Sequence, residues 1–234
     1  MRNKLKQVSS VVVAMIVIAV IGGGWTEVGN TEQFTDTTIV TSVSAGSHTL
    51  AVGDDGSLWA WGSNSSGQLG TETTTGRNSI PIKIMDNVVA ASAGLSHSVA
   101  IRSDGSLWAW GSNYFGQLGD GTTDDRIAPV QIGTDMDWYY ISADGQNSVA
   151  LRADGSLWTW GFTLSAQLGN DALAARNTPA QIGTDTDWIR VAAGYDHTIA
   201  LRADGSLWAW GYNWTGQLGD GTTTYRNTPV QISN

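Results

Sequence analysis

Apolar and polar residues alternate in short runs along the C-terminal part of the chain, which predicts β-strands rather than helices. Four such runs are WIRVAAG from Trp188, HTIAL from His197, SLWAW from Ser206 and PVQI from Pro229. Asp204 and Gly205 stand between the second and third runs. Because an Asp-Gly pair favours the positive φ values of a tight turn, these two strands are expected to form an antiparallel hairpin.

The same pattern recurs four times, which identifies a repeat of about fifty residues. The segment SLWAWG begins at Ser57, Ser106 and Ser206, and its variant SLWTWG at Ser156, giving spacings of 49, 50 and 50 residues. All four prolines occupy one repeat position and all three histidines another: Pro81, Pro129, Pro179 and Pro229, and His48, His97 and His197. Since proline is tolerated at the head of a strand or at a sheet edge, the fourth strand is expected to lie outermost. The repeats are expected at about 38–85, 86–133, 134–183 and 184–234, in one domain over 38–234.

Both faces of each third strand are apolar, and this decides the fold class. Side chains alternate between the faces of a strand, so Trp208 and Trp210 share one side and Leu207 and Ala209 the other. Radial stacking lets the indoles of one sheet meet the small residues of the next. The sequence therefore predicts an all-β β-propeller built from four four-stranded blades. The ring is expected to close by itself, to be completed by a second chain as a homo-oligomer, or to remain an incomplete arc.

The N-terminal segment is typical of a signal peptide. Three basic residues precede the apolar run 11–21, and Gly22 and Gly24 provide small residues for a cut after residue 24. An 11-residue apolar run is too short to span a membrane. We therefore expect residues 1–24 to be a signal peptide, 25–37 to be a lead segment, and the protein to be secreted or located in the cell envelope. The chain has no cysteine, so its stability must come from packing.

The charge balance argues against nucleic-acid partners. The chain has 12 Lys and Arg against 21 Asp and Glu, and removal of residues 1–24 with their three cations lowers the formal net charge from −9 to −12. An acidic chain is a poor partner for phosphate backbones. Most cations occupy two repeat positions: Arg77, Arg126, Arg176 and Arg226, and Arg102, Arg152 and Arg202. The first set is expected to pair with loop carboxylates, and the second lies at hairpin tips beside aspartates, so neither builds a basic patch.

One long run carries a resemblance to a known family. The segment AAGYDHTIALRADGSLWAWGYNWTGQLGDGTTTYRNTP resembles the regulator of chromosome condensation repeat, with its Gly-x-x-His-Ser/Thr, Trp-Gly-x-Asn and Gly-Gln-Leu-Gly motifs. The resemblance extends from about Thr38 to the C-terminus and suggests a secreted bacterial member with four repeats. It implies a propeller of four-stranded blades, usually seven. The family includes a chromatin-binding guanine-nucleotide exchange factor, ubiquitin-ligase components and a secreted β-lactamase-inhibiting propeller, so fold alone does not choose the function.

No residue pattern indicates catalysis, a metal or a cofactor. Rotation about a propeller axis holds the three repeat-equivalent histidines apart, so they are expected to form structural hydrogen bonds. The order Asp196-His197-Thr198 resembles a catalytic triad only along the chain. Evenly spaced repeats leave no insertion for nucleotide exchange. We therefore expect a protein that is not an enzyme and holds no cofactor.

The third repeat departs from the others. Asn147 replaces the histidine, and the loop after Trp160 reads Gly161-Phe162-Thr163-Leu164-Ser165-Ala166, without the Asn and Gly of its siblings. The Asp-Gly-Thr that follows Gly-Gln-Leu-Gly in repeats two and four becomes Asn170-Asp171-Ala172. Drift is the favoured explanation, and a modified contact is the alternative.

Two positions between the Asn and Gly of each Trp-Gly loop are not set by the repeat. They hold Ser65-Ser66, Tyr114-Phe115, Leu164-Ser165 and Trp214-Thr215. We expect Tyr114, Phe115 and Trp214, with Tyr195 and Asp196 from the loop before the histidine, to form a contact surface. In the alternative interpretation the aromatic rings fold over neighbouring blades.

These observations predict a non-catalytic recognition module that binds a protein partner through the loops of one propeller face. Carbohydrate binding is the first alternative, because exposed aromatic rings stack on sugars and an extracellular chain meets polysaccharide. The second alternative is an enzyme inhibitor similar to the β-lactamase-inhibiting propeller. Guanine-nucleotide exchange is not expected, since the predicted location and the even repeats argue against it.

Overall fold

The computed structural model describes residues 38–163, 167–169 and 175–233, which form β-strands and connecting loops. Blade 1 contains β1 (Val40–Ala45), β2 (His48–Gly53), β3 (Leu58–Ser63) and β4 (Arg77–Met85). Blade 2 contains β5 (Val88–Ala93), β6 (His97–Arg102), β7 (Leu107–Gly111) and β8 (Arg126–Gln131). Blade 3 contains β9 (Trp138–Asp144), β10 (Asn147–Arg152), β11 (Leu157–Gly161) and β12 (Arg176–Gln181). Blade 4 contains β13 (Trp188–Ala193), β14 (His197–Arg202), β15 (Leu207–Gly211) and β16 (Arg226–Ser233).

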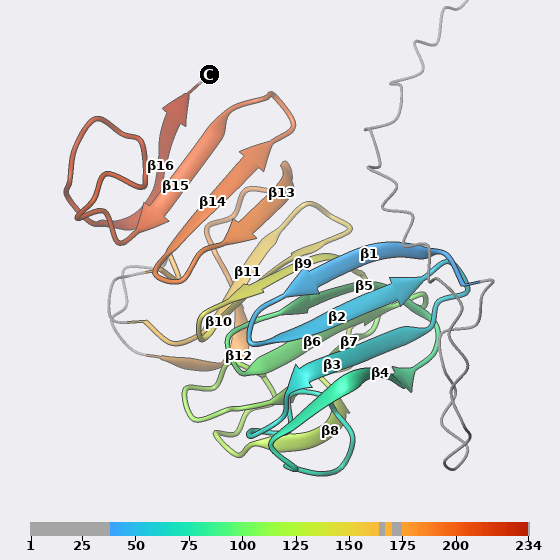
Figure 1. The fold of residues 1–234 in the computed structure, drawn as a ribbon. Helices are drawn as coiled ribbons and strands as arrows, with labels where there is room; N and C mark the ends of the chain where they lie inside the picture. The colour runs from blue at the N-terminus through green and yellow to red at the C-terminus, as the bar shows by residue number, and fades with distance from the viewer. Residues whose placement is uncertain (1–37, 164–166, 170–174, 234) are drawn as a thin grey trace, which may run out of the picture.

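The all-β class and the four four-stranded blades are confirmed. Each sheet is an antiparallel meander whose strands pair in chain order. The first strands lie innermost, since β5 contacts both β1 and β9, and β9 contacts β13 (Figure 1). Successive blades are in contact, whereas no comparable contact joins blade 4 to blade 1 among the described strands. The four blades therefore form an arc (Figure 1).

The predicted signal peptide at 1–24 and lead segment at 25–37 lie outside the described residues. Within the part of the chain that is described, no helix has the length and apolar character needed to cross a membrane.

The core consists of three layers, each between two successive blades. In the first layer, Leu58 and Ala60 of β3 pack with Trp110 of β7. Equivalent residues form the second layer around Trp160 and the third around Trp210. The three indoles are completely buried. The predicted stacking of tryptophan against small and aliphatic residues of the neighbouring blade is therefore confirmed.

The Asp-Gly-Ser-Leu-Trp segment folds as predicted into a hairpin, and its side chains fix the turn. In blade 2 only the glycine of the pair has a positive φ, 80° at Gly105. Asp104 Oδ1 accepts hydrogen bonds from the backbone N–H of Ser106 at 3.0 Å and from its hydroxyl at 2.6 Å. The same hydroxyl accepts the Trp108 indole N–H at 2.9 Å. The aspartate therefore acts as a side-chain cap, which explains why it precedes the glycine in every repeat.

The proline-containing strands β4, β8, β12 and β16 are the outer strands of their sheets, as predicted. They begin earlier than the prolines suggest. In blade 1, Gly62 pairs with Asn78 and Ala60 with Ile82, so the segment between them bulges. Pro81 lies in this irregular segment, where its missing N–H removes no ladder hydrogen bond.

Candidate partner-binding surface

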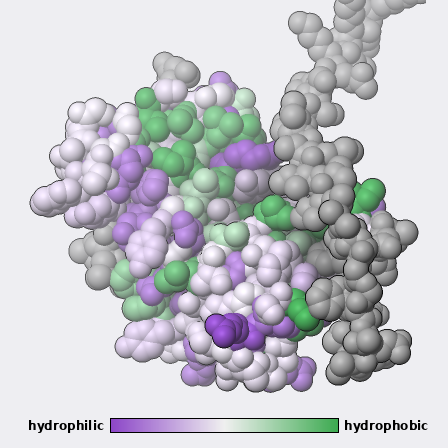
Figure 2. Space-filling model, in the orientation of Figure 1, coloured by the Kyte–Doolittle hydropathy of each residue, from purple (hydrophilic) through white to green (hydrophobic). Residues whose placement is uncertain are grey.

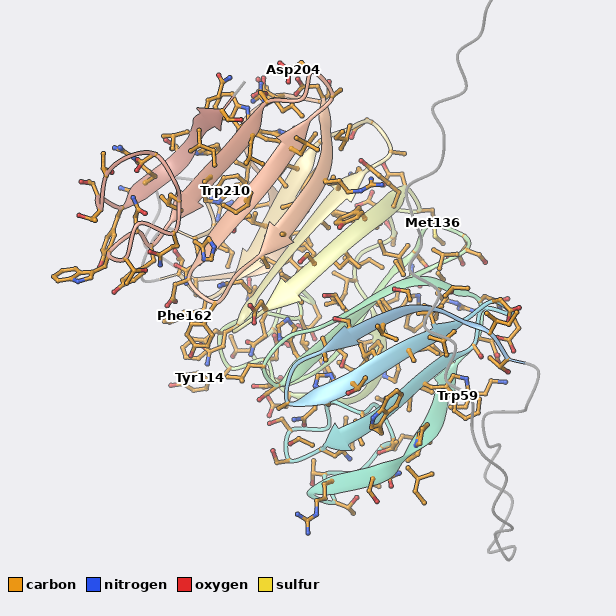
Figure 3. The ribbon with its side chains drawn as sticks, turned by 45° about the horizontal axis from the view of Figure 1, so that its top comes forward. Trp59, Tyr114, Met136, Phe162, Asp204 and Trp210 are labelled. Atoms are coloured by element: carbon orange, nitrogen blue, oxygen red, sulfur yellow. The ribbon has the colours of Figure 1, made fainter. Side chains whose placement is uncertain are left out.

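In an antiparallel meander the connecting loops lie at the two opposite ends of the strands, and therefore on two opposite sides of the arc. The loops between first and second strands and between third and fourth strands emerge at one end, which we name the loop end. The Asp-Gly turns emerge at the other, the turn end. Figure 3 shows Tyr114 and Phe162 close together at the loop end, while Asp204 lies at the far end of blade 4. The predicted contact residues therefore belong to one end of the molecule.

A buried asparagine organises the long loop in blades 1, 2 and 4. In blade 2, Asn113 Oδ1 accepts the Leu118 N–H at 3.0 Å, and Nδ2 donates to Asp120 Oδ1 at 3.0 Å. Gln117 Oε1 accepts the Phe115 N–H at 2.9 Å. Asn64 and Asn213 hold their loops in the same way. The side chains at 114 and 115 take no part in this network, so the loop scaffold leaves their identity open.

The predicted pairing of arginine with loop carboxylates is confirmed in blades 2 and 4. Arg126 Nε and Nη2 both lie 2.7 Å from Asp120 Oδ2. Partial burial opposes ionisation of Asp120, but hydrogen bonds from Thr122 and the Arg126 charge still lower its pKa. In blade 4 the Thr222 hydroxyl, together with Arg226 and others, lowers the pKa of Asp220 to about 2. These ion pairs close the base of each loop and hold it in one shape.

The aromatic residues of the loop end fall into two groups. Tyr114 is 74% exposed, Trp214 70% and Tyr195 57%. Phe115 is only half-buried, and its ring lies 4.9 Å from that of Tyr114 and 4.5 Å from that of Phe162 in blade 3. Phe115 thus folds over the neighbouring blade, as the alternative interpretation predicts, whereas Tyr114 and Trp214 project into solvent.

Sequence reasoning missed several aromatic residues of this surface. Phe162 follows the Trp-Gly of its repeat, and Tyr212 occupies the same position in blade 4, where its ring lies 5.0 Å from that of Tyr225. Ser63 and Ser112 occupy this position in the first two blades. The signal was the variation at this one repeat position, which turns from serine to aromatic in the later blades.

The loops before the histidines form a chain of contacts near the inner strands. The Leu95 N–H donates to the Gly145 carbonyl at 3.0 Å, and Asn147 Nδ2 donates to the Tyr195 carbonyl at 3.3 Å. Asp196 is partly buried, and this burial raises its pKa. No contact described in the structure joins Tyr195 or Trp214 to the Tyr114–Phe115–Phe162 cluster. The predicted contact residues therefore all lie at the loop end but form separate patches.

The predicted structural role of the histidines is confirmed in two blades. His48 Nε2 lies 2.7 Å from Ser98 Oγ, and His97 Nε2 lies 3.0 Å from Ser148 Oγ. Each bond joins one blade to the next. Burial lowers the pKa of His48 to about 4 and that of His97 to about 3, so both rings are neutral near pH 7.

The triad-like order of Asp196, His197 and Thr198 does not become a triad in space. The Thr198 hydroxyl donates to the Gln167 carbonyl of blade 3 at 3.0 Å, and the neighbouring His197 points to the opposite face of β14. The described residues also contain no group of three His, Cys, Asp or Glu side chains that could hold a metal ion. In the altered loop of the third repeat, Leu164, Ser165, Ala166 and 170–172 lie outside the described residues.

Comparison with known proteins decides the family. The family model for the RCC1-like domain matches residues 22–234, which is most of the chain. This protein belongs to the RCC1-like domain family. The match agrees with the four repeats, the meandering blades and the interblade tryptophans. A comparison with curated protein sequences gives no match.

Solved propellers share the fold of this RCC1-like domain. Human WBSCR16 is 25% identical with a TM-score of 0.72, covering 83% of this chain and 52% of that chain. Prp20p from Saccharomyces cerevisiae, reported with its binding properties to Gsp1p and histones, is 23% identical with a TM-score of 0.76, covering 86% and 52%. Yeast RCC1 (Prp20) bound to Kap60 is 24% identical with a TM-score of 0.75, covering 87% and 50%. The chain spans about half the length of these structures.

The turn end of this RCC1-like domain is built for stability. Arg152 pairs with Asp135, and its Nε lies 3.6 Å from Asp137 Oδ1. Its guanidinium also lies over the rings of Trp138 and Trp158, 4.5 and 4.1 Å from their centroids. Arg202 repeats the arrangement in blade 4. Arg152 and Arg202 are therefore both engaged by carboxylates and indoles at the turn end.

Proposed function

We propose that this RCC1-like domain is a non-catalytic module that binds a protein partner through its loop end. The observation that carries the proposal is the exposure of Tyr114 and Trp214 at positions that the loop scaffold does not use. Large aromatic side chains on a rigid scaffold supply contact area at low entropic cost and are enriched at binding hot spots. The protein complexes reported for yeast RCC1 support the same class of function.

The partner is proposed to be neutral or basic. The chain carries a formal net charge of −9, and the loop end adds exposed carboxylates at Asp124 and Asp125 beside the blade 2 loop. Electrostatic complementarity raises the association rate of a cationic partner and disfavours acidic ones. We therefore propose that the interaction weakens as salt is added.

The proposed place of action is the cell envelope or the external medium. The arrangement of basic, apolar and glycine residues over 1–24 supports export. Expression of the full chain with its own leader tests this by intact mass. The expected product begins at Trp25, and a chain that retains residues 1–24 in the cytoplasm contradicts export.

Affinity capture from envelope and secreted fractions tests the binding function. We expect Tyr114→Ala and Trp214→Ala to weaken capture of the partner by about tenfold or more each, as for hot-spot aromatics. Met136→Ala is the matched control, because Met136 is also an exposed apolar residue, 55% exposed, but lies at the turn end. Circular dichroism of each variant checks that the blades remain folded.

The same variants separate the alternative functions. Binding to a glycan array that disappears in Trp214→Ala, without capture of any protein, would establish carbohydrate binding instead. Nanomolar inhibition of a β-lactamase would place the chain with the inhibitors. Equal capture of one partner by the wild type, Tyr114→Ala and Trp214→Ala would contradict recognition through the loop end.

A further inference from the structure

The loop between β7 and β8 of blade 2 combines two pairs of residues that no other repeat has together. Tyr114 and Phe115 occupy the two positions that the loop scaffold leaves open, and Asp124 and Asp125 stand just before β8. The corresponding carboxylate positions hold Thr75-Gly76 in the first repeat, Ala174-Ala175 in the third and Thr224-Tyr225 in the fourth. The aromatic pair and the carboxylate pair are therefore specific to blade 2 and are not part of the repeat.

One of the two carboxylates is held beside the aromatic pair. Asp125 Oδ1 accepts the backbone N–H of Asn113, the residue before Tyr114, at 2.6 Å. In blade 1 the equivalent N–H, that of Asn64, donates to the backbone carbonyl of Gly76 at 2.9 Å instead. The loop can therefore close without a carboxylate, and Asp125 adds a negative charge close to the base of the Tyr114 side chain.

The loop does not neutralise these two charges. Arg126 is the only cation among residues 112–126, all of which the structure describes, and its guanidinium lies 2.7 Å from Asp120. Asp124 and Asp125 are exposed and take no part in the ion pairs of the described residues. The loop therefore presents two negative charges next to exposed aromatic rings.

The rings beside these carboxylates form a small apolar surface that extends onto blade 3. The ring of Phe115 contacts those of Tyr114 and Phe162, and Figure 3 shows Tyr114 and Phe162 close together. On the face of the molecule drawn in Figure 2, hydrophobic residues form separate groups among hydrophilic and neutral ones. A partner at the blade 2 loop therefore has to match apolar and charged groups in close proximity.

The turn end of the same chain shows which group this chemistry holds. Arg152 lies over the rings of Trp138 and Trp158, 4.5 and 4.1 Å from their centroids. Its guanidinium also pairs with Asp135. A guanidinium suits this combination because its planar face stacks on rings while its N–H groups pair with carboxylates. The blade 2 loop combines rings and carboxylates in the same way, and the cation–π contacts formed by the described residues lie elsewhere.

We propose that the loop end binds an arginine side chain of the protein partner at this surface, which we name the arginine site. The site consists of Tyr114, Phe115, Asp124 and Asp125 of blade 2 and Phe162 of blade 3. The inference rests on the proposed function, because it names the group that the loop end recognises. The guanidinium stacks on the exposed Tyr114 ring and pairs with the two carboxylates, while an apolar residue next to the arginine contacts the two phenylalanine rings. Lysine fits less well, because its ammonium group has no planar face to stack.

Two synthetic peptides that differ in one group test the site. The peptide Ser-Phe-Arg-Phe-Ser carries the guanidinium, and the same peptide with citrulline in place of arginine carries a neutral group of the same shape. Two-dimensional NMR follows the titration of the protein with each peptide. We expect the arginine peptide to shift the amide signals of residues 112–126 in a saturable way. It should bind at least about fivefold more tightly than the citrulline peptide, the combined effect of an exposed cation–π contact and exposed ion pairs. Added salt should weaken only the arginine peptide.

Charge-matched variants locate the binding. Asp125→Asn removes the charge and keeps an oxygen for the Asn113 N–H, and we expect it to weaken the arginine peptide by roughly two- to fivefold and to leave the citrulline peptide unchanged. Asp54→Asn is the matched control, because Asp54 is an exposed carboxylate at the turn end whose Oδ1 accepts the Ile39 N–H at 3.1 Å. This control should leave both dissociation constants unchanged. Tyr114→Ala should weaken both peptides.

The outcomes separate the arginine site from the proposed function. Equal dissociation constants for the two peptides, or no saturable shift within residues 112–126, would overturn the arginine site. Equal effects of Asp125→Asn and Asp54→Asn would assign the binding to net charge and would also overturn it. The proposed function would stand without the site if capture of the partner still depended on Tyr114 and Trp214. If Tyr114→Ala and Trp214→Ala also left capture unchanged, both would fail.

Discussion

Protonation of the histidines of blades 1 and 2 opposes folding. His48 and His97 are buried and hydrogen-bonded across blade interfaces, and burial lowers their pKa values to about 4 and about 3 from 6.5. The unfolded chain therefore takes up protons first as the pH falls. We expect the free energy of unfolding to be highest above pH 6.5. It should fall between pH 6.5 and about 4, by on the order of 1 kcal/mol per pH unit for each histidine. Thermal unfolding followed by circular dichroism measures this slope.

A matched variant isolates the histidine effect. Asn147 fills the same position in blade 3 without a titratable group, so His97→Asn is a substitution that the repeat already accepts. Together with His48→Asn it should remove most of the slope between pH 6.5 and 4, while the loss of carboxylate hydrogen bonds at lower pH remains. An unchanged slope in the double variant would show that other groups control acid stability.

At the residue scale, the sequence predicted the role of a residue better than it predicted which residue it contacts. The structural role of His97 followed from its repeat position, but its partner Ser148 lies 51 residues away in the next blade. A period shows which residues are equivalent, and it does not show which equivalent positions meet across an interface. For the same reason the sequence did not predict the contact of Phe115 with Phe162, because these residues occupy different repeat positions in neighbouring blades.

At the scale of the loop, the glycine that receives an indole is a matched test of interblade packing. Gly119 has φ 81° and a Cβ there would lie 2.8 Å from Trp160 Nε1, whereas Gly219 has φ 73° and nothing within 4 Å. Alanine at either position costs about 1–2 kcal/mol for the left-handed backbone. We expect Gly119→Ala to lose a further 1–3 kcal/mol or so from overpacking. Denaturant unfolding measures both losses, and equal losses would contradict the indole contact.

The strands and hairpins were the elements best predicted from the sequence. Alternating apolar residues and the Asp-Gly pair act locally, so the second and third strands of each blade formed where expected. The outer strands began earlier than predicted, at Arg77 rather than Pro81 in blade 1, because a bulge accommodates the proline within the strand. A bulge depends on pairing with the neighbouring strand, and alternation in one strand does not reveal it.

At the scale of the whole molecule, the four blades are joined by three interfaces. Among the described strands, blades 2 and 3 each pack against two neighbouring blades, while blades 1 and 4 each pack against one. In repeat proteins the stability of a unit is close to the sum of its own stability and its neighbour interfaces. Blades 1 and 4 should therefore unfold before blades 2 and 3. The loop end, which is proposed to bind a partner, should be most rigid in blades 2 and 3.

Hydrogen exchange measured by mass spectrometry tests this gradient. In the single chain we expect peptides from β14 and β15 to exchange faster than those from β6 and β7 or from β10 and β11, because Ile199, Leu201 and Leu207 are partly exposed while their counterparts in the central blades are covered. Equal exchange in all four blades of the single chain would instead mean that the arc unfolds as one cooperative unit despite its open ends.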